Sequence, residues 1–234
     1  MALRPTDFKS VASTNSATQA HRNCTGWGPT SSGTIRRVQN TAPAAEIHVA
    51  EVSCRRGERL LFSGLSWHAG PGAAVRIVGR NGAGKTTLLR LLAGLAWPEA
   101  GEVRRGGGVA WVGHGDGLKD DLSPRENLEF HCALQGAPRT AAGPALARLG
   151  LDAVADLPCR VLSAGQRRRA ALARLCIGDA PIWLLDEPLT ALDADAQRVV
   201  EALIDEHGRR GGIVVFTSHQ PLASARPVVE VALA

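Results

Sequence analysis

Apolar runs of strand length alternate with segments of helical period from Glu46 onward. The runs at 73–78, 182–185 and 213–217 are rich in Val, Ile and Leu, as expected of strands buried on both faces. A helix is expected directly after the first run, and others over 124–135, 141–149, 164–177 and 193–207. Edge strands are expected over 47–53 and 60–67, with two short strands inside 101–112. The alternation predicts an α/β domain over 46–234, with a helical subdomain at about 114–177.

Residues 1–45 have a different composition. They are rich in Ser, Thr, Asn and Ala, poor in acids, and without helical or strand period, so we expect a disordered or spurious N-terminal extension. A cleaved organellar transit peptide is the alternative interpretation. This segment carries a net charge of +4 out of the chain's +5, which leaves +1 for the rest. The basic balance therefore does not argue for a nucleic-acid partner.

The cysteine spacing bears on the redox compartment, and the hydropathy bears on membrane insertion. The five cysteines are odd in number, widely spaced and without a C-x-x-C pair, which indicates reduced thiols in a cytosolic compartment. Apolar stretches stay below the roughly 18–20 residues that a membrane span needs. Any membrane association is therefore expected to depend on a partner.

The first candidate site is a glycine-rich loop between the strand at 73–78 and the helix after it. It has the spacing G-x-x-x-x-G-K-[ST], in which glycines let the backbone N–H groups point into one concavity. Lys85 would reach the β- and γ-phosphates, and the Thr86 hydroxyl would hold Mg²⁺. The residues expected to bind nucleotide are Gly79, Arg80, Asn81, Gly82, Ala83, Gly84, Lys85, Thr86 and Thr87. The loop predicts binding of a nucleoside triphosphate.

The second candidate is an acidic pair, Asp186-Glu187, at the end of the apolar run 182–185. Ligands bind at the carboxyl ends of strands in open α/β sheets. Asp186 would hold Mg²⁺, and Glu187 would orient and deprotonate the attacking water. A helix-capping acid pair is the alternative, which Pro188 and the preceding strand disfavour.

The third candidate is Leu162-Ser163-Ala164-Gly165-Gln166, which opens a predicted helix. It resembles the signature motif of ATP-binding-cassette (ABC) ATPases, with Ala164 where a glycine is usual. The resemblance spans about 47–233 and implies a P-loop NTPase of ABC ATPase type, with a mostly parallel core sheet, an antiparallel edge sheet and a helical subdomain. It also implies a head-to-tail homodimer, in which Ser163, Gly165 and Gln166 bind ATP held by the second copy. Segment 191–193 resembles the family's D-loop, and His219 its catalytic switch histidine.

Two positions depart from the family pattern. His114 stands where a glutamine usually senses Mg²⁺, and we treat it as a candidate metal ligand. Arg56 stands where an aromatic residue usually stacks on adenine. A guanidinium can stack on a purine, but a solvated pair with Arg55 is an equal alternative.

The segment 112–128, together with 60–65, 162–169 and 217–220, resembles the cytochrome c maturation ABC ATPases, also called haem exporter ATP-binding subunits. The resemblance implies an Mg²⁺-dependent ATPase docked on membrane-spanning subunits, with no direct haem binding and no nucleic acid. It implies a peripheral position on the cytoplasmic face of the inner (plasma) membrane, or on the mitochondrial inner membrane if residues 1–45 are a transit peptide. An exporter of another small substrate and an ATP-binding module without turnover are the alternatives.

Overall fold

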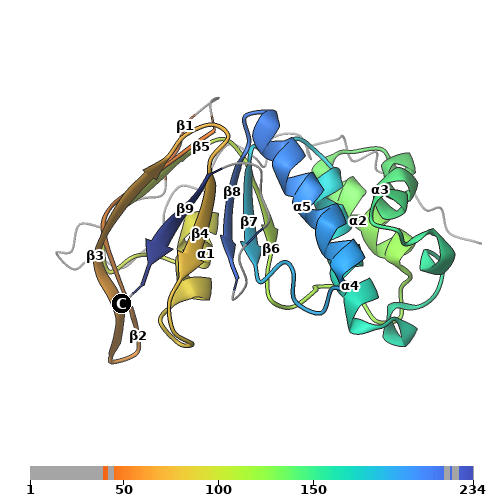
Figure 1. Ribbon diagram of the computed structural model, residues 1–234, viewed down its shortest axis with the longest axis horizontal. Helices are drawn as coiled ribbons and strands as arrows, with labels where there is room; N and C mark the ends of the chain where they lie inside the picture. Colours follow the sequence, from red (N-terminus) through yellow and green to blue (C-terminus); the bar gives the residue numbers. More distant parts are fainter. Residues whose placement is uncertain (1–38, 42–44, 219–221, 223–226, 234) are drawn as a thin grey trace, which may run out of the picture. The chain divides into compact units, whose positions relative to one another are not determined.

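The computed structural model describes residues 39–41, 45–218, 222 and 227–233. These residues belong to the compact unit that begins at Arg36. Its central sheet has five parallel strands in the order β6-β7-β8-β4-β9 (Figure 1). Their bounds are β4 (Ala74–Val78), β6 (Val109–Val112), β7 (Ile182–Asp186), β8 (Ile213–Thr217) and β9 (Val228–Ala232).

The second sheet has four strands in the order β1-β5-β2-β3. Its strands are β1 (Gln39–Thr41), β2 (Glu46–Arg56), β3 (Arg59–Ala69) and β5 (Ala100–Gly106). Strand β2 is antiparallel to both β3 and β5, whereas β1 is parallel to β5. The prediction of a parallel core sheet with an antiparallel edge sheet is confirmed.

The strands of the central sheet bury alternate side chains on its two faces. Ile182 and Leu184 of β7 pack with helix α1 (Lys85–Ala93), between the two sheets. Trp183 and Leu185 point to the opposite face, towards helix α5 (Ala194–Arg209) and the helical subdomain. All five residues of β7 and of β8 are buried, which explains the continuous apolar runs.

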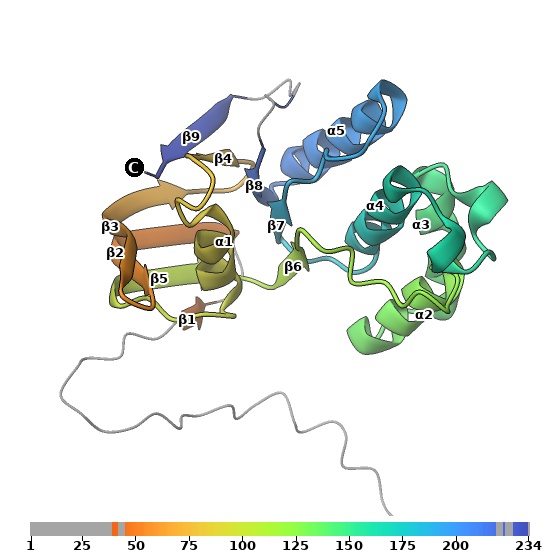
Figure 2. The ribbon, with the colours of Figure 1, turned by 90° about the horizontal axis from the view of Figure 1, so that it is seen from below.

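The helical subdomain contains α2 (Pro124–Gln135), α3 (Ala142–Arg148) and α4 (Ala164–Leu172), with 3-10 turns at Arg139–Ala141, Asp152–Val154, Cys159–Val161 and Ala173–Cys176. Figure 2 shows these helices on one side of the central sheet and the four-stranded sheet on the other. The helix expected over 164–177 ends as an α-helix at Leu172. Arg174 Nε donates to the Ala171 carbonyl at 3.0 Å, the acceptor that a further α-turn would have used.

Strands β1 and β9 were not predicted. Strand β9 is an edge strand, and only Val231 of its five residues is buried. The apolar residues of β9 are interrupted by Glu230, so the strand lacks the unbroken apolar run of β7.

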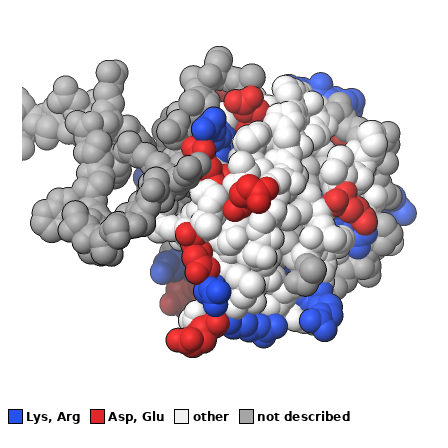
Figure 3. Space-filling view, turned by 90° about the vertical axis from the view of Figure 1, so that its left-hand side faces the viewer, with Lys and Arg blue, Asp and Glu red and all other residues white. Residues whose placement is uncertain are grey.

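The surface of the four-stranded sheet faces the viewer in Figure 3, where acidic and basic residues intermix over the described part of that face. None of the helices in the described segments is both long and apolar enough to cross a bilayer.

Candidate functional site

The glycine-rich loop turns sharply into α1. Gly84 caps this helix with φ +100, and a Cβ built there would lie 3.1 Å from side-chain atoms of Leu61 and Phe62. A Cβ on Gly79 would lie 2.8 Å from the Leu233 carbonyl oxygen. The loop therefore needs glycine at these positions, both for its left-handed backbone and for its close approach to neighbouring strands.

The loop opens on a cavity of about 450 Å³. The cavity is lined by two residues from the β2–β3 hairpin, six from the loop and α1, and three from the ends of β6 and β7: Arg56, Leu61, Asn81, Gly82, Gly84, Lys85, Thr86, Thr87, His114, Asp186 and Glu187. Gly79, Arg80 and Ala83 form the body of the loop, where Ala83 N donates to the Arg80 carbonyl at 3.1 Å. The cavity thus gathers residues from motifs a hundred positions apart.

Lys85 and Thr86 begin α1 and carry the polar groups of the loop. Lys85 Nζ donates to the Gly79 carbonyl at 2.8 Å, so the ammonium is folded over the concavity that the glycines create. Thr86 Oγ1 donates to Asp186 Oδ2 at 2.8 Å. The two oxygens expected to hold Mg²⁺ are therefore adjacent, and both are hard ligands of the kind that ion prefers.

Asp186 is held from the opposite side by Thr217, at the end of the neighbouring strand β8. Thr217 Oγ1 donates to Asp186 Oδ1 at 2.7 Å and accepts from the Glu187 N–H at 2.9 Å. Thr217 is fully buried and Asp186 is only 3% exposed. Sequence reasoning did not identify this role of Thr217. The available signal was its place at the end of a strand adjacent to β7, since Asp186 and Thr217 are paired in register.

Glu187 has a left-handed backbone with φ +51, which is costly for a residue with a side chain. Such a conformation persists only where surrounding contacts fix it. It aims Glu187 into the cavity beside Lys85, Thr86 and His114. The placement fits a general base next to a phosphate cradle.

His114 and Arg56 both line the cavity, as the sequence positions predicted. His114 follows the carboxyl end of β6, and Arg56 ends β2. Whether His114 ligates Mg²⁺ and whether Arg56 stacks on a base stay predictions.

Ser163, Gly165 and Gln166 are not among the described residues that line this cavity. They form the first turn of α4, where Ser163 Oγ accepts from Gln166 N and Gln166 Oε1 accepts from Ser163 N, in a capping box. A Cβ on Gly165 would lie 2.7 Å from the Ala191 carbonyl oxygen, so this glycine allows close packing of α4 on the D-loop-like segment. Their contact with nucleotide stays a prediction.

An ion-pair cluster joins the segment after β6 to α4. Arg167 Nε donates to Asp116 Oδ2 at 2.7 Å, and its Nη1 donates to Asp120 Oδ1 at 2.7 Å. Burial alone would raise the pKa of Asp116, but hydrogen bonds from Arg167 and the Leu118 N–H lower it below its usual value. The segment that carries His114 is thereby tied to the helix that carries Ser163.

His219, the predicted switch histidine, lies outside the described residues. The described chain on its near side ends at Ser218, which follows β8 directly.

The chain is similar to known proteins. Residues 62–190 match the family model described as ABC transporter. A protein of Aromatoleum aromaticum named cytochrome c biogenesis ATP-binding export protein CcmA is 47% identical over 196 residues, which cover 77% of this chain and 92% of that protein. Proteins of the same name from Pseudomonas putida and Nitrosomonas europaea are 46% and 42% identical, covering 75% and 80% of this chain and 90% and 95% of their own lengths.

A solved structure of a metal-chelate type ABC transporter in an inward-facing conformation superposes with a TM-score of 0.69 at 28% identity, covering 81% of this chain and 80% of the other. The glycine loop, the acidic pair and the signature helix predict the ABC ATPase family from sequence, and the family match confirms it. The chain is an ATPase of the ABC transporter family and belongs, within it, to the cytochrome c biogenesis ATP-binding export proteins.

Proposed function

We propose that this chain is the ATP-hydrolysing subunit of a membrane complex that energises c-type cytochrome biogenesis, by export of haem or by release of a haem-loaded chaperone. The observation that carries the proposal is the bonded series Thr86–Asp186–Thr217–Glu187 at the mouth of the glycine loop. It aligns a phosphate cradle, a hard-oxygen pair and a candidate base in one cavity. The names of the relatives supply the biological process.

Each side chain then has a defined task. Lys85 would exchange its bond to the Gly79 carbonyl for the β- and γ-phosphates, and the loop N–H groups would bind phosphate oxygens. Thr86 and Asp186 would hold Mg²⁺, which when bound neutralises phosphate charge. Glu187 would accept a proton from the attacking water, and His114 and His219 would contact the metal and the γ-phosphate respectively.

The complete site would require two copies of the chain. Ser163, Gly165 and Gln166 would bind the triphosphate held by a second copy, through a helix N-terminus that attracts anions. A head-to-tail homodimer would thus enclose two nucleotides.

Membrane-spanning subunits would provide the docking site and the path for the cargo, with this chain peripheral on the cytoplasmic face of the inner membrane. The mitochondrial inner membrane is the alternative, should residues 1–45 be a transit peptide. In neither case would the chain itself bind haem or nucleic acid.

A genetic complementation experiment tests whether the complex serves cytochrome c biogenesis or another cargo. A bacterium lacking its own homologous subunit would receive the full chain or a Lys85→Ala variant, and c-type cytochromes would be measured by haem staining of membrane proteins. We expect restoration by the wild-type chain only. A wild-type chain that co-purifies with heterologous transporter subunits and hydrolyses ATP, yet restores no cytochrome, would favour the second candidate, an exporter of another small substrate.

A further inference from the structure

One buried arginine in the signature helix contacts the catalytic end of the central sheet. Arg168 of α4 is only 6% exposed. Its Nη2 donates to the carbonyls of Asp186 at 2.5 Å and Glu187 at 2.9 Å, and its Nε to that of Pro188 at 3.4 Å. Its Nη1 donates to the Gly113 carbonyl at 2.8 Å. The planar fork of a guanidinium suits this arrangement, because its five N–H donors point in fixed directions.

The acceptors of these bonds are all main-chain carbonyls, so no carboxylate forms a direct salt bridge with Arg168 in the described segments. Burying a charge in this way is unfavourable unless many hydrogen bonds compensate. Burial also lowers the pKa of Arg168, an effect that the charge of Asp186 opposes. Because all four bonds end on carbonyls of the segments that follow β6 and end β7, they point to a role in the geometry of those segments.

The carbonyls that accept from Arg168 belong to the segments that place Glu187 and His114 in the nucleotide cavity. Glu187 holds its left-handed φ of +51 between two carbonyls that Arg168 contacts, those of Asp186 and Glu187 itself. Gly113 directly precedes His114, which lines the same cavity. One side chain therefore contacts the segments at the ends of both β6 and β7. The helix that carries it, α4, is capped by Ser163.

Arg168 lies outside the nucleotide cavity. It lines a neighbouring cavity of about 270 Å³, which shares His114 and Glu187 with the nucleotide cavity. It does not reach the phosphate cradle, and any effect on chemistry must pass through the residues it holds.

We propose that Arg168 is a positioning residue, which sets the backbone of Asp186-Glu187 and of the Gly113–His114 segment in the geometry for hydrolysis and links both to the Ser163 end of α4. This inference rests on the proposed ATPase function. It assigns the buried arginine a part in Mg²⁺-dependent turnover and none in holding the triphosphate.

The test compares Arg168→Gln and Arg168→Lys with Arg169→Lys in the full chain. Arg169 is a matched control, because its Nη1 also donates to two main-chain carbonyls, those of Leu149 and Gly150, but inside the helical subdomain. The first readout is hydrogen exchange, without nucleotide, of the amides at 186, 187, 189 and 190, since Pro188 has none. The second is equilibrium ATP binding with and without Mg²⁺, and the third is the Mg²⁺ dependence of kcat and KM.

For both Arg168 variants we expect amide exchange in the segment 186–190 to be about tenfold faster than in wild type. ATP binding in EDTA should stay near wild type. Most of the increase in ATP affinity that Mg²⁺ gives the wild-type chain should be lost. In Arg168→Gln, kcat should fall about 10–100-fold, since small misplacements of catalytic groups are costly. Arg168→Lys should recover part of that loss, and Arg169→Lys should match wild type in all three measurements.

Wild-type exchange and wild-type Mg²⁺ dependence in a folded Arg168→Lys or Arg168→Gln protein would overturn the inference. If Arg168→Gln fails to fold, Arg168→Lys decides alone. If neither folds while Arg169→Lys does, Arg168 is a stability residue and the inference is wrong. A wild-type chain without ATPase activity would refute the proposed function instead, and the exchange data would stay interpretable.

Discussion

The buried Thr217 hydroxyl allows the sharpest quantitative prediction. Thr217→Val keeps the β-branched shape and the strand preference of the side chain, and removes only the hydroxyl. Two hydrogen bonds disappear, one to the carboxylate of Asp186 and one from the Glu187 N–H. The Asp186 carboxylate stays buried, and the Glu187 N–H stays partly buried.

The expected cost follows from those two bonds. A hydrogen bond to a charged group contributes about 1.5–3 kcal/mol, and one between neutral groups about 0.5–1.5 kcal/mol. We therefore expect Thr217→Val to lower the free energy of unfolding by about 2–4 kcal/mol. Thr217→Ser keeps the hydroxyl and loses one buried methyl, so it should cost only about 1 kcal/mol.

Urea unfolding followed by tryptophan fluorescence measures both costs, since Trp183 and Trp111 lie in β7 and β6. The same preparations should show near-wild-type ATP turnover for Thr217→Ser and a loss of roughly tenfold or more for Thr217→Val. If Thr217→Val is as stable and as active as Thr217→Ser, the hydroxyl does not hold the acidic pair and the account of the site is wrong.

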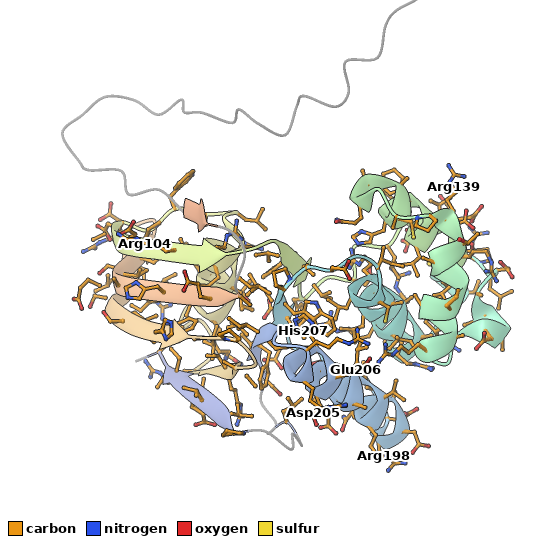
Figure 4. The ribbon with its side chains drawn as sticks, turned by 90° about the horizontal axis from the view of Figure 1, so that it is seen from above. Arg104, Arg139, Arg198, Asp205, Glu206 and His207 are labelled. Atoms are coloured by element: carbon orange, nitrogen blue, oxygen red, sulfur yellow. The ribbon has the colours of Figure 1, made fainter. Side chains whose placement is uncertain are left out.

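Three further predictions concern the cavity and the opposite end of the sheet. ATP at about one hundred times its Kd should stabilise the wild-type chain by about 2.7 kcal/mol, and thermal unfolding should show no such gain for Lys85→Ala; an equal gain would place the phosphates elsewhere. Arg56→Ala should raise KM for ATP about 3–10-fold with kcat unchanged, as expected for lost stacking on the base; an unchanged KM would favour the solvated alternative. His207, labelled in Figure 4, belongs to α5. It stacks on Trp183 with ring centroids 3.8 Å apart, and burial lowers its pKa below the ordinary value. The unfolded chain then takes up the proton first, so stability present above about pH 6.5 should decline as pH falls further. His207→Asn should flatten that decline in denaturant titrations between pH 7.5 and 5.5, and an identical slope would refute the assignment.

The strands that are buried on both faces could be predicted from sequence, as could the edge strands β3 and β6, whereas the edge strands β1 and β9 could not. The runs that became β7 and β8 are apolar at nearly every position because helices cover one face and α1 covers the other. Strand β9 exposes Val229 and Glu230, and the glutamate interrupts its short apolar segment.

The residues of the candidate site also fall into two groups, those that the sequence predicts and those that only the structure reveals. The residues of the glycine loop and the acidic pair follow from local spacing, because their chemistry requires neighbours in the chain. Thr217 and Arg168 act through partners 18 to 55 positions away, at Asp186 and Gly113. Three consecutive arginines at 167–169 also look alike in sequence, whereas packing buries only Arg168.

The proposed mechanism depends most directly on the carboxylate of Glu187, the residue that follows β7. The decisive measurement is the rate of Mg²⁺-dependent ATP hydrolysis by Glu187→Gln, set beside wild type from the same preparation and at saturating ATP. We predict a fall of about 10²–10⁴-fold, as expected when a general base is removed, with ATP binding retained. Hydrolysis by Glu187→Gln at the wild-type rate would contradict the proposed mechanism.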